Sequence, residues 1–420
     1  MLYYLFEYLQ SKGVPGIGAF TYISTRAGLA LILSVIISTL IGSKIIDWLR
    51  SKQMSDAIRP LDIEGQMAKV GTPTMGGIII IIAIIIPTLL LNKLNNVYII
   101  LMLVTTIWLG ALGFADDYIK VFKKNKEGMH GKYKLIAQLG LGVLVAVVLL
   151  TSPAVVIKEN VSTETINHEL VVTHSNVETK STKTTIPFVK NHNLDYADLA
   201  KSIGLKQNAN LFTFLLVTLI FVFIVMAVSN SANLTDGLDG LATGSSSIIG
   251  IALGILAYVS SHFQLASYLN IMFIPDAEEL VIFAASFIGA TVGFLWYNSY
   301  PAQVFMGDTG SLTLGGIIAV YAIIIRKELL LPILCGIFLV EALSVIIQTS
   351  YFKYTKKRYG SGKRVFKMTP LHHHYQKPAG VVDAVIQKPS RPIAEAKITV
   401  RFWLIGILLA VLTIVTLKLR

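Results

Sequence analysis

The chain has 420 residues, of which 54% are apolar and only 14% are charged. Soluble domains carry roughly 25% charged residues, so this composition excludes an ordinary soluble protein and indicates an integral membrane protein. The formal net charge is +12, and we expect a lipid bilayer as the partner of this basic chain and no nucleic acid. The single cysteine, Cys335, excludes an intrachain disulfide framework and a cysteine-based metal site.

The first 20 residues combine aromatic residues with leucines but have neither the basic region nor the cleavage site of a signal peptide, so we expect a short interfacial helix. A helix needs about 20 apolar residues to span a bilayer, and ten spans can be placed along the rest of the chain. We expect them at approximately 27–46, 75–91, 97–115, 134–151, 211–230, 240–259, 280–298, 312–325, 329–351 and 400–418. The predicted fold is an all-α polytopic membrane protein with one domain over residues 1–420.

Two connecting segments are long. The first covers residues 152–207, and within it the stretch from Val155 to Phe188 mixes β-branched residues with Thr, Ser, Asn and Glu, which favours β-hairpins and predicts a small β-rich insertion. Residues 353–399 carry the run His372-His373-His374. Lysine and arginine are enriched in cytoplasmic loops, and 20 of them fall on the side of 353–399 against nine in the opposite loops. The histidine-containing loop is therefore expected in the cytoplasm, and both termini and the 152–207 insertion on the periplasmic side.

Acidic residues end several of these spans. They are Asp116 and Asp117 after the third span, Asp236 and Asp239 between the fifth and sixth, and Asp308 between the seventh and eighth. An acid at a helix end commonly marks only the membrane boundary, and the first pair could simply balance neighbouring lysines. Helices far apart in the sequence nevertheless deliver all of these acids to the predicted cytoplasmic face, which favours a shared site.

Glycines flank these acids in a pattern that suits a phosphate ligand. The segments 230–240 and 305–311 alternate Asp or Asn with Gly at helix junctions, where backbone amides and carboxylates can both approach a ligand. The spacing superficially resembles a calcium loop but lacks the third acid and the bidentate glutamate of an EF-hand. Magnesium is usually held by one or two protein carboxylates together with substrate phosphates, so a magnesium diphosphate site is predicted.

Two further motifs have simpler interpretations beside the functional ones. The stretch 69–77 opens the second span, and its glycines and Thr74 are also explained as turn and capping residues. Three adjacent histidines cannot all point the same way from a helix, which disfavours a zinc site. We expect a loop or short helix that brings one or two of these imidazoles to substrate phosphates.

The motifs and their order resemble a known family. They are Gly71-Thr72-Pro73-Thr74-Met75-Gly76-Gly77, Gly113-Phe114-Ala115-Asp116-Asp117, residues 233–242, residues 305–312, Pro370-Leu371-His372-His373-His374-Tyr375 and Arg401-Phe402-Trp403. In these segments the chain is similar to the bacterial phospho-N-acetylmuramoyl-pentapeptide transferases, a branch of the polyprenyl-phosphate N-acetylhexosamine-1-phosphate transferases. The resemblance extends over nearly the whole chain, and its motifs are individually uncommon.

The resemblance implies a ten-span enzyme of the bacterial inner membrane, usually a homodimer, whose catalytic cleft opens to the cytoplasm. Such an enzyme transfers phospho-MurNAc-pentapeptide from UDP-MurNAc-pentapeptide to undecaprenyl phosphate, which gives UMP and lipid I for peptidoglycan. Both reactants are anionic, so catalysis is expected to depend on charge neutralisation and alignment, with Mg²⁺ bridging the diphosphate.

The same resemblance implies roles for individual residues. Asp308 and Asn233 are the expected metal ligands, and Asp116, Asp117, Asp308 and His372 the expected catalytic residues, with Asp116 as base or orienter of the lipid phosphate. A phosphate monoester has a second pKa of about 6, so direct displacement ranks above a covalent aspartyl-phosphate route. The expected substrate-binding residues are Lys69, Thr74, Lys124, Lys132, Asn233, Asp236, Gly237, Leu238, Asp239, Asn298, Phe305 and His373.

Three alternatives remain open. A sister transferase that uses UDP-GlcNAc usually carries an interrupted histidine motif, unlike the run in this chain. An ion-coupled transporter places its acids near the bilayer midplane within inverted repeats, whereas these acids end spans on one face. A purely structural membrane protein leaves the motifs unexplained. The chain departs from the family pattern in the length of 152–207 and in an extra stretch between Gln376 and Arg401, which bears on how the peptide part of the substrate is held.

Overall fold

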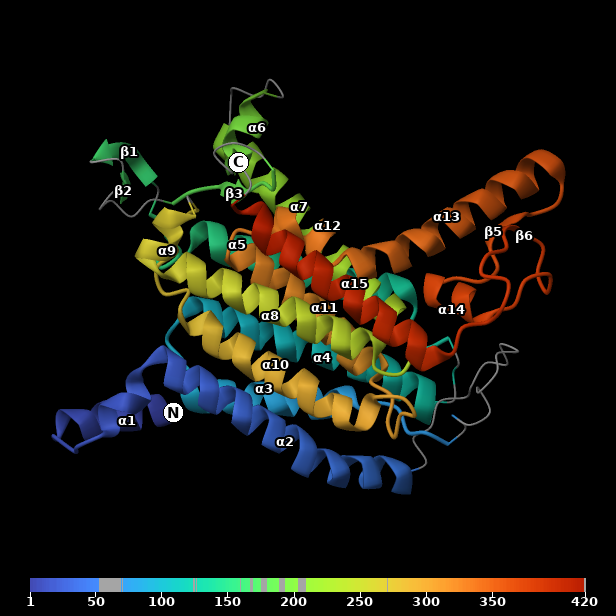
Figure 1. Cartoon of the computed structure of the whole chain (residues 1–420), viewed down its shortest axis with the longest axis horizontal. Helices are drawn as coiled ribbons and strands as arrows, with labels where there is room; N and C mark the ends of the chain where they lie inside the picture. Colours follow the sequence, from blue (N-terminus) through green and yellow to red (C-terminus); the bar gives the residue numbers. More distant parts are fainter. Residues whose placement is uncertain are drawn as a thin grey trace.

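The computed structural model describes most of the chain. The described residues are 1–52, 69, 71–123, 125, 127–158, 160–166, 169–174, 180–188, 193–202, 209–269 and 271–418. Figure 1 shows a bundle of long helices that run roughly side by side, with short helices and strands at its two ends.

Nine helices in the described part of the chain are long and apolar enough to cross a membrane. They are α2 (Ile23–Ser51), α4 (Val97–Phe122), α5 (Gly131–Thr151), α7 (Ala209–Thr235), α8 (Leu241–Ser261), α10 (Glu279–Asn298), α11 (Gly307–Ile324), α13 (Gly336–Tyr359) and α15 (Glu395–Thr416). A shorter apolar helix, α3 (Gly77–Leu91), follows α2. These helices match the predicted spans in order, which confirms an all-α polytopic membrane fold.

Small residues let the central helices pack closely. A Cβ added at Gly289 on α10 would lie 2.5 Å from the carbonyl oxygen of Leu31 on α2, and one added at Gly293 would lie 2.7 Å from Cβ of Ser38. Helices in a membrane associate largely through such close packing, because lipid removes the hydrophobic driving force. Helix α11 contacts α3, α4, α7 and α8, and every residue from Thr309 to Ile324 is buried. It forms the centre of the bundle.

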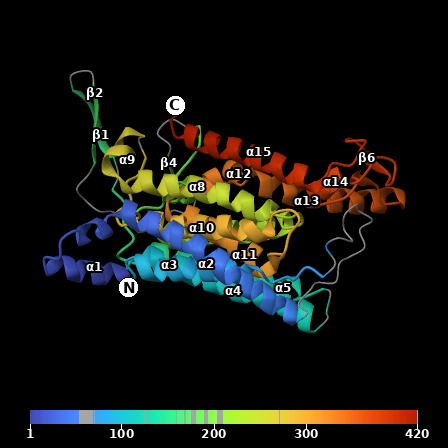
Figure 2. The ribbon, with the colours of Figure 1, turned by 60° about the horizontal axis from the view of Figure 1, so that its bottom comes forward.

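The short elements lie at the two ends of the bundle (Figures 1 and 2). One end carries α1 (Leu2–Ser11), η1 (Ile17–Thr21), β1 (Asn160–Ile166), β2 (Glu169–His174), β3 (Lys183–Thr185), β4 (Asn193–Asp195), α6 (Tyr196–Ser202) and α9 (Phe263–Tyr268). Strands β1 and β2 pair antiparallel, as do β3 and β4, which confirms the small β-rich insertion after α5. The other end carries β5 (Arg364–Phe366), α14 (Leu371–Gln376) and β6 (Ala384–Ile386), and β5 pairs parallel with β6.

The predicted span 329–351 differs from the structure. This stretch begins as η3 (Glu328–Leu330) and α12 (Leu331–Leu334), breaks at Cys335, and continues as α13. Hydropathy alone could not show the break, because the residues on both sides of it are equally apolar. Helix α13 also runs past the predicted end to Tyr359, projects from the bundle (Figure 1), and stops at Gly360, whose φ of +76° gives the left-handed cap usual for glycine.

Candidate active site

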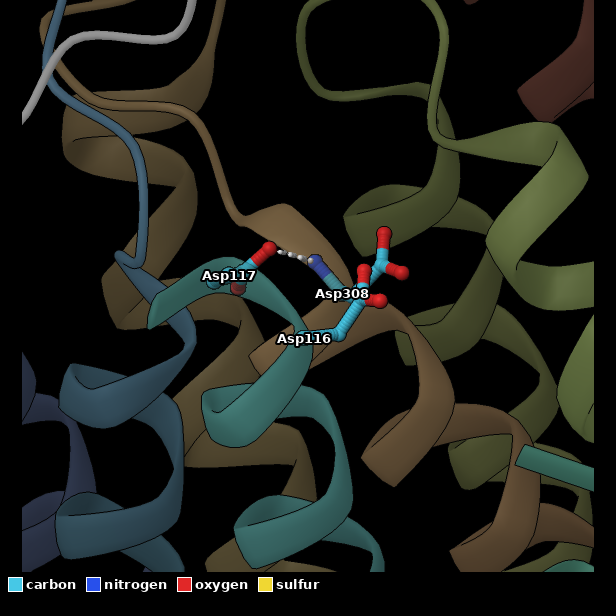
Figure 3. Close-up of side chains that lie close together, drawn as sticks. All are labelled: Asp116, Asp117 and Asp308. Carbon is cyan, nitrogen blue, oxygen red and sulfur yellow. Dashed lines mark hydrogen bonds between the residues drawn. The ribbon is translucent and has the colours of Figure 1, made fainter. Parts of the chain in front are cut away.

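Three aspartates from two helices form the centre of the candidate site. Asp116 and Asp117 lie near the end of α4, and Asp308 lies in the first turn of α11 (Figure 3). One carboxylate oxygen from each lies within 4.8 Å of the other two. Asp116 and Asp117 are only 0% and 2% exposed. The structure therefore brings together acids that are separated by nearly two hundred residues in the sequence, as the shared-site hypothesis required.

Asp117 binds the N-terminus of α11 across the helix interface. Its Oδ2 accepts hydrogen bonds from the backbone N–H of Thr309 (2.8 Å) and from the Thr309 hydroxyl (2.6 Å), and its Oδ1 accepts one from the backbone N–H of Asp308 (3.1 Å). The first N–H groups of a helix have no partner within the helix, and an anionic acceptor also stabilises the positive end of the helix dipole. Asp117 thus fixes the position of Asp308 relative to α4.

Two lysines bridge Asp116 to Asp308. The ammonium of Lys120, one turn after Asp116 on α4, lies 2.7 Å from Asp116 Oδ2 and 3.1 Å from Asp308 Oδ1. Lys134 at the start of α5 lies 3.0 Å from the same Asp116 oxygen and 2.6 Å from Asp308 Oδ2. The other oxygen of Asp116 accepts a hydrogen bond from the N–H of Met129 (2.7 Å). The carboxylate of Asp116 is therefore held from both sides.

Neither of these lysines was predicted as a site residue from the sequence. The spacing of four residues between Asp116 and Lys120 on a predicted helix was an available signal for an ion pair. Lys134 had no such signal, because its contacts depend on how the start of α5 packs against α4 and α11.

Glycines let the backbones around the aspartates meet. A Cβ added at Gly113 would lie 2.2 Å from the carbonyl oxygen of Asp308, which no side chain could tolerate without a shift of α4 or α11. Gly307 has a φ of +72°, and a Cβ there would lie 2.6 Å from Asp117 Oδ2 and 3.0 Å from Thr74 Oγ1. These close approaches explain the glycines in two of the motifs, and they place the buried Thr74 beside the aspartates.

The end of α7 supplies a further polar group. Asn233 donates hydrogen bonds from Nδ2 to Asp308 Oδ1 (2.9 Å) and to Ser311 Oγ (2.8 Å). This orientation leaves its Oδ1 as the atom that can bind a metal. Asp236 follows in the turn after α7, and burial together with the charges of Asp308 and Asp117 raises the pKa of Asp236 well above its usual range. The negative charges of Asp308 and Asp117 therefore act on the Asp236 carboxyl.

A second polar group surrounds Asp239, just before α8. The Lys69 ammonium lies 2.6 Å from Asp239 Oδ1 and 2.5 Å from Oε1 of Glu395 at the start of α15. Burial opposes the charge on Lys69, but the two carboxylates outweigh it and raise the pKa of Lys69. The same ammonium lies 5.8 Å from the centre of the Phe305 ring, which is within the range of a cation–π contact. Three predicted substrate-binding residues, Lys69, Asp239 and Phe305, thus lie together, and Glu395 was not predicted.

Asn298 and Leu238 are buried beside this group. Asn298 accepts a hydrogen bond from the Thr243 hydroxyl (2.9 Å) and donates one to the carbonyl of Val304 (3.0 Å). These bonds connect α8, α10 and the segment that leads to Phe305. Leu238 is 4% exposed and packs in the hydrophobic core. Both residues are therefore buried in the structure that surrounds this group.

The histidine run forms the short helix α14. His372 is fully buried, and its Nδ1 lies 3.1 Å from Oε2 of Glu341 on α13. Its Nε2 has no hydrogen-bond partner among the described residues and faces Gly237, where an added Cβ would lie 2.2 Å away. One imidazole nitrogen of His372 is therefore available to a ligand. Glu341 was not predicted from the sequence, although an acid inside a predicted span is itself an indication of function.

His373 packs against His372, with ring centres 4.2 Å apart. Its Nδ1 lies 2.8 Å from Oε1 of Gln376. Burial, followed by the neighbouring His372, lowers the pKa of His373 to about 4. This imidazole is therefore neutral at pH 7.

Lys132 is not among the contacts of the aspartates in the described part of the chain. Lys132 is exposed, and its ammonium lies 5.1 Å from the centre of the Tyr133 ring. Lys124 lies outside the residues that the structure describes.

Comparison with known proteins identifies the family. A model of glycosyl transferase family 4 matches residues 99–326, which is more than half of the chain. The phospho-N-acetylmuramoyl-pentapeptide-transferase of Parabacteroides distasonis is 68% identical over 422 residues, covering 100% of both chains. The proteins of the same name from Porphyromonas gingivalis and Bacteroides fragilis are 62% and 57% identical, again over 100% of both chains. The chain belongs to the phospho-N-acetylmuramoyl-pentapeptide-transferase family.

Membership in this family makes the chain a transferase, and its long apolar helices make it a multi-pass membrane protein. The alignments with these transferases cover the full length of the chain. They therefore include residues 152–207 and the stretch between Gln376 and Arg401, which differed from the family pattern expected from the sequence.

The aspartate cluster fits a divalent metal in this transferase. Carboxylate oxygens are donors that Mg²⁺ prefers, and Asp116, Asp117 and Asp308 each present one within 4.8 Å of the other two, with the Asn233 amide hydrogen-bonded to Asp308 beside them. Three carboxylates face only two ammonium groups, those of Lys120 and Lys134, so the cluster retains an excess of negative charge that a cation would neutralise.

Proposed function

We propose that the chain transfers phospho-MurNAc-pentapeptide from UDP-MurNAc-pentapeptide to undecaprenyl phosphate, forming lipid I and UMP. The observation that carries the proposal is the junction of α4, α5 and α11, where Lys120 and Lys134 bridge Asp116 and Asp308 in a member of this family. In this reaction an oxygen of the lipid phosphate attacks the phosphorus that bears the sugar. The bond from that phosphorus to the UMP oxygen breaks, and UMP carries away the negative charge.

The side of the membrane is part of the proposal. The aspartates lie at the end of the bundle that also carries α14 and the basic end of α13, with Lys356, Lys357 and Arg358 in its last turn. Basic loops are retained in the cytoplasm, which supports an active site open to the cytoplasm in the bacterial inner membrane. Residues 152–207 then face the periplasm without a catalytic role, and the family resemblance supports a homodimer.

The two bridging lysines are proposed to accept the phosphates. Phosphoryl transfer depends mainly on positioning and on charge stabilisation, because both reactants are anionic and the protein has little covalent chemistry to do. Lys120 and Lys134 can exchange a carboxylate partner for a phosphate oxygen by a small rotation of their side chains. In doing so they would hold the lipid phosphate beside the diphosphate.

Asp116 and Asp117 are proposed to orient the lipid phosphate and not to act as nucleophiles. Asp116 is held by two ammonium groups and one backbone N–H, and all three stabilise its charged form and weaken it as a nucleophile. Both oxygens of Asp117 are occupied by the N-terminus of α11. The lipid phosphate is already ionised at neutral pH, so direct displacement requires no protein nucleophile.

The group around Asp239 is proposed to bind the nucleotide. The Phe305 ring can stack on uracil, and Lys69, which contacts both Phe305 and Asp239, can reach the diphosphate. His372 is proposed to face the sugar with Nε2 and to accept a hydrogen bond from a hydroxyl there, because its Nδ1–H donates to Glu341. Glu341 would hold this tautomer and position the ring.

Mg²⁺ is the proposed metal, with Asp308 and Asn233 as its ligands. When bound, it would neutralise the diphosphate and stabilise the departing UMP. The aspartates and the oxygen donors support this choice, since zinc prefers nitrogen and sulfur ligands.

The test is UMP release by the purified full-length protein with Mg²⁺, undecaprenyl phosphate and one of two donors. We expect UMP with UDP-MurNAc-pentapeptide and none with UDP-GlcNAc. Release only with UDP-GlcNAc would assign the chain to the sister transferase reaction. Release with neither donor would contradict the proposed reaction and favour the alternative of an ion-coupled transporter.

A further inference from the structure

A cavity of about 80 Å³ lies at the end of the bundle opposite the aspartates. It is lined by the last apolar residues of α5, by Lys180 and Ser181 before β3, and by Arg326 after α11. A water molecule occupies about 30 Å³ of liquid, so the cavity has room for a group larger than one water. Along α11, Arg326 lies about 27 Å from Asp308, so this cavity does not belong to the candidate active site.

Arg326 is buried without a partner for one of its charged nitrogens. The residue is 3% exposed, and its Nη1 has no hydrogen-bond partner among the described residues. The carboxylate of Glu328, two residues further on, forms no hydrogen bond or ion pair with Arg326 in the described structure: its Oε1 accepts a hydrogen bond from the Tyr196 hydroxyl (2.9 Å), and its Oε2 has no hydrogen-bond partner among the described residues. The charge of Glu328 acts on Arg326, but Nη1 remains a buried donor without an acceptor among the described residues, and such a group is costly unless it is hydrogen-bonded.

Arg326 has a backbone conformation that is unusual for a residue with a side chain. The N–H of Arg326 donates to the carbonyl of Ile323 and the N–H of Lys327 donates to that of Ala322, which is the Schellman arrangement that ends a helix. Arg326 occupies the position of this motif that glycine usually takes, with a φ of +56°. A residue with a side chain is strained there. An arginine in this position carries a conformational cost, which is consistent with a function of its side chain.

Two further donors face the same cavity. Lys180 Nζ donates one hydrogen bond to the carbonyl of Thr151 at the end of α5 (2.7 Å), which fixes the ammonium at the cavity and leaves its other hydrogens for a ligand. Ser181 Oγ accepts a hydrogen bond from the N–H of Lys183 (3.1 Å), so its own hydrogen can be donated. A guanidinium, an ammonium and a hydroxyl together match the oxygens of a phosphate group.

We propose that this cavity is a phosphate-binding site, with Arg326 as its main ligand and Lys180 as its second. The site lies where α5 and α11 end, which is the level of lipid headgroups for helices that span a bilayer. Its ligand is a phosphate oxyanion, carried either by a lipid headgroup or by free inorganic phosphate. The site binds this group on the face opposite to the proposed transfer reaction.

The test measures the melting temperature of the purified full-length protein in phosphate-free detergent at constant ionic strength. One series adds inorganic phosphate. A second adds mixed micelles of phosphatidylglycerol, compared with monogalactosyl diacylglycerol, which has no phosphate. The variants are Arg326→Met, which keeps the side-chain bulk, Arg326→Gly, which removes the side chain and the backbone strain, and Lys180→Met. Lys201→Met is the matched control, because Lys201 lies at the same end, is exposed and pairs only with Asp198 in the described chain.

We expect phosphate or phosphatidylglycerol to raise the melting temperature of the wild type and of Lys201→Met. Both Arg326 variants should need at least about tenfold more of the same ligand for the same rise, and Lys180→Met should fall between. A rise with phosphatidylglycerol alone identifies a lipid headgroup, and a rise with inorganic phosphate identifies the free anion. UMP release should be unchanged in Arg326→Gly, which shows that the variant is folded. Equal responses of the wild type and both Arg326 variants to both ligands would overturn the proposal.

Discussion

The contact between Asp117 and the N-terminus of α11 yields a quantitative prediction. Replacing Asp117 with Asn keeps the shape of the side chain but removes its charge and one acceptor oxygen. With its oxygen toward Thr309, the Asn retains two of the three hydrogen bonds and turns an NH₂ group toward the N–H of Asp308. The loss of a charged acceptor for a buried N–H costs about 1–3 kcal/mol. If Asp308 is displaced and the activation free energy rises by this amount, turnover falls by a factor of about 5–150.

The assay is UMP release at saturating substrates and Mg²⁺, together with the melting temperature of each variant. Thr309→Val removes only the hydroxyl donor and should lose less turnover than Asp117→Asn. Tyr118→Phe is the matched control, because Tyr118 is the next residue on α4 but is 43% exposed and faces away from the aspartates. Turnover of Asp117→Asn within twofold of the wild type, with an unchanged melting temperature, would refute the positioning role of Asp117.

Three further predictions concern the other side chains of the site. The pKa of His373 is lowered to about 4, so between about pH 6.5 and pH 4 the unfolded chain binds a proton at this residue and the folded chain does not. The free energy of unfolding should therefore fall as the pH drops from about 6.5 to 4. His373→Asn should make the melting temperature depend less on pH in this range. Gly237→Ala should displace the His372 ring and lower turnover by more than about tenfold, whereas Gly131→Ala, where an added Cβ meets no atom within 4 Å, should have no effect. Lys69→Met should raise the KM for the nucleotide sugar by about tenfold with a smaller change in kcat, as titrations of UMP release would show; an unchanged KM would contradict a role in nucleotide binding.

The sequence predicted the fold because the relevant signals are local. Each span is visible as an apolar run of sufficient length, and the hairpin of β1 and β2 follows from a polar stretch rich in β-branched residues. The break between α12 and α13 was missed because hydropathy continues across it, and the signals that could have indicated it were Pro332 and Gly336 on either side of Cys335. The extension of α13 beyond the bundle was missed because its last turns are charged and no longer resemble a span.

The candidate site was predicted only in part. Some of its residues stand in recognisable sequence motifs, whereas others are brought to the site only by the packing of distant helices. The aspartates were recognisable, since charge is rare along this chain and stands beside glycine. Lys134, Glu341 and Glu395 contact the predicted residues only through packing of α5, α13 and α15, which no spacing in the sequence encodes. Conversely, Lys132 was expected in the cleft on the family resemblance, and the structure places its ammonium over Tyr133.

Formation of lipid I by the wild type and by Asp308→Asn, measured together with UMP over a range of Mg²⁺ concentrations, tests the central claim most directly. The wild type should release one UMP for each lipid I formed, and only when Mg²⁺ is present. Asp308→Asn should lose at least about 100-fold in rate even at saturating Mg²⁺, because it removes the acid that contacts both lysines and Asn233. A variant that makes lipid I at the rate of the wild type would contradict the assignment of this cluster as the active site.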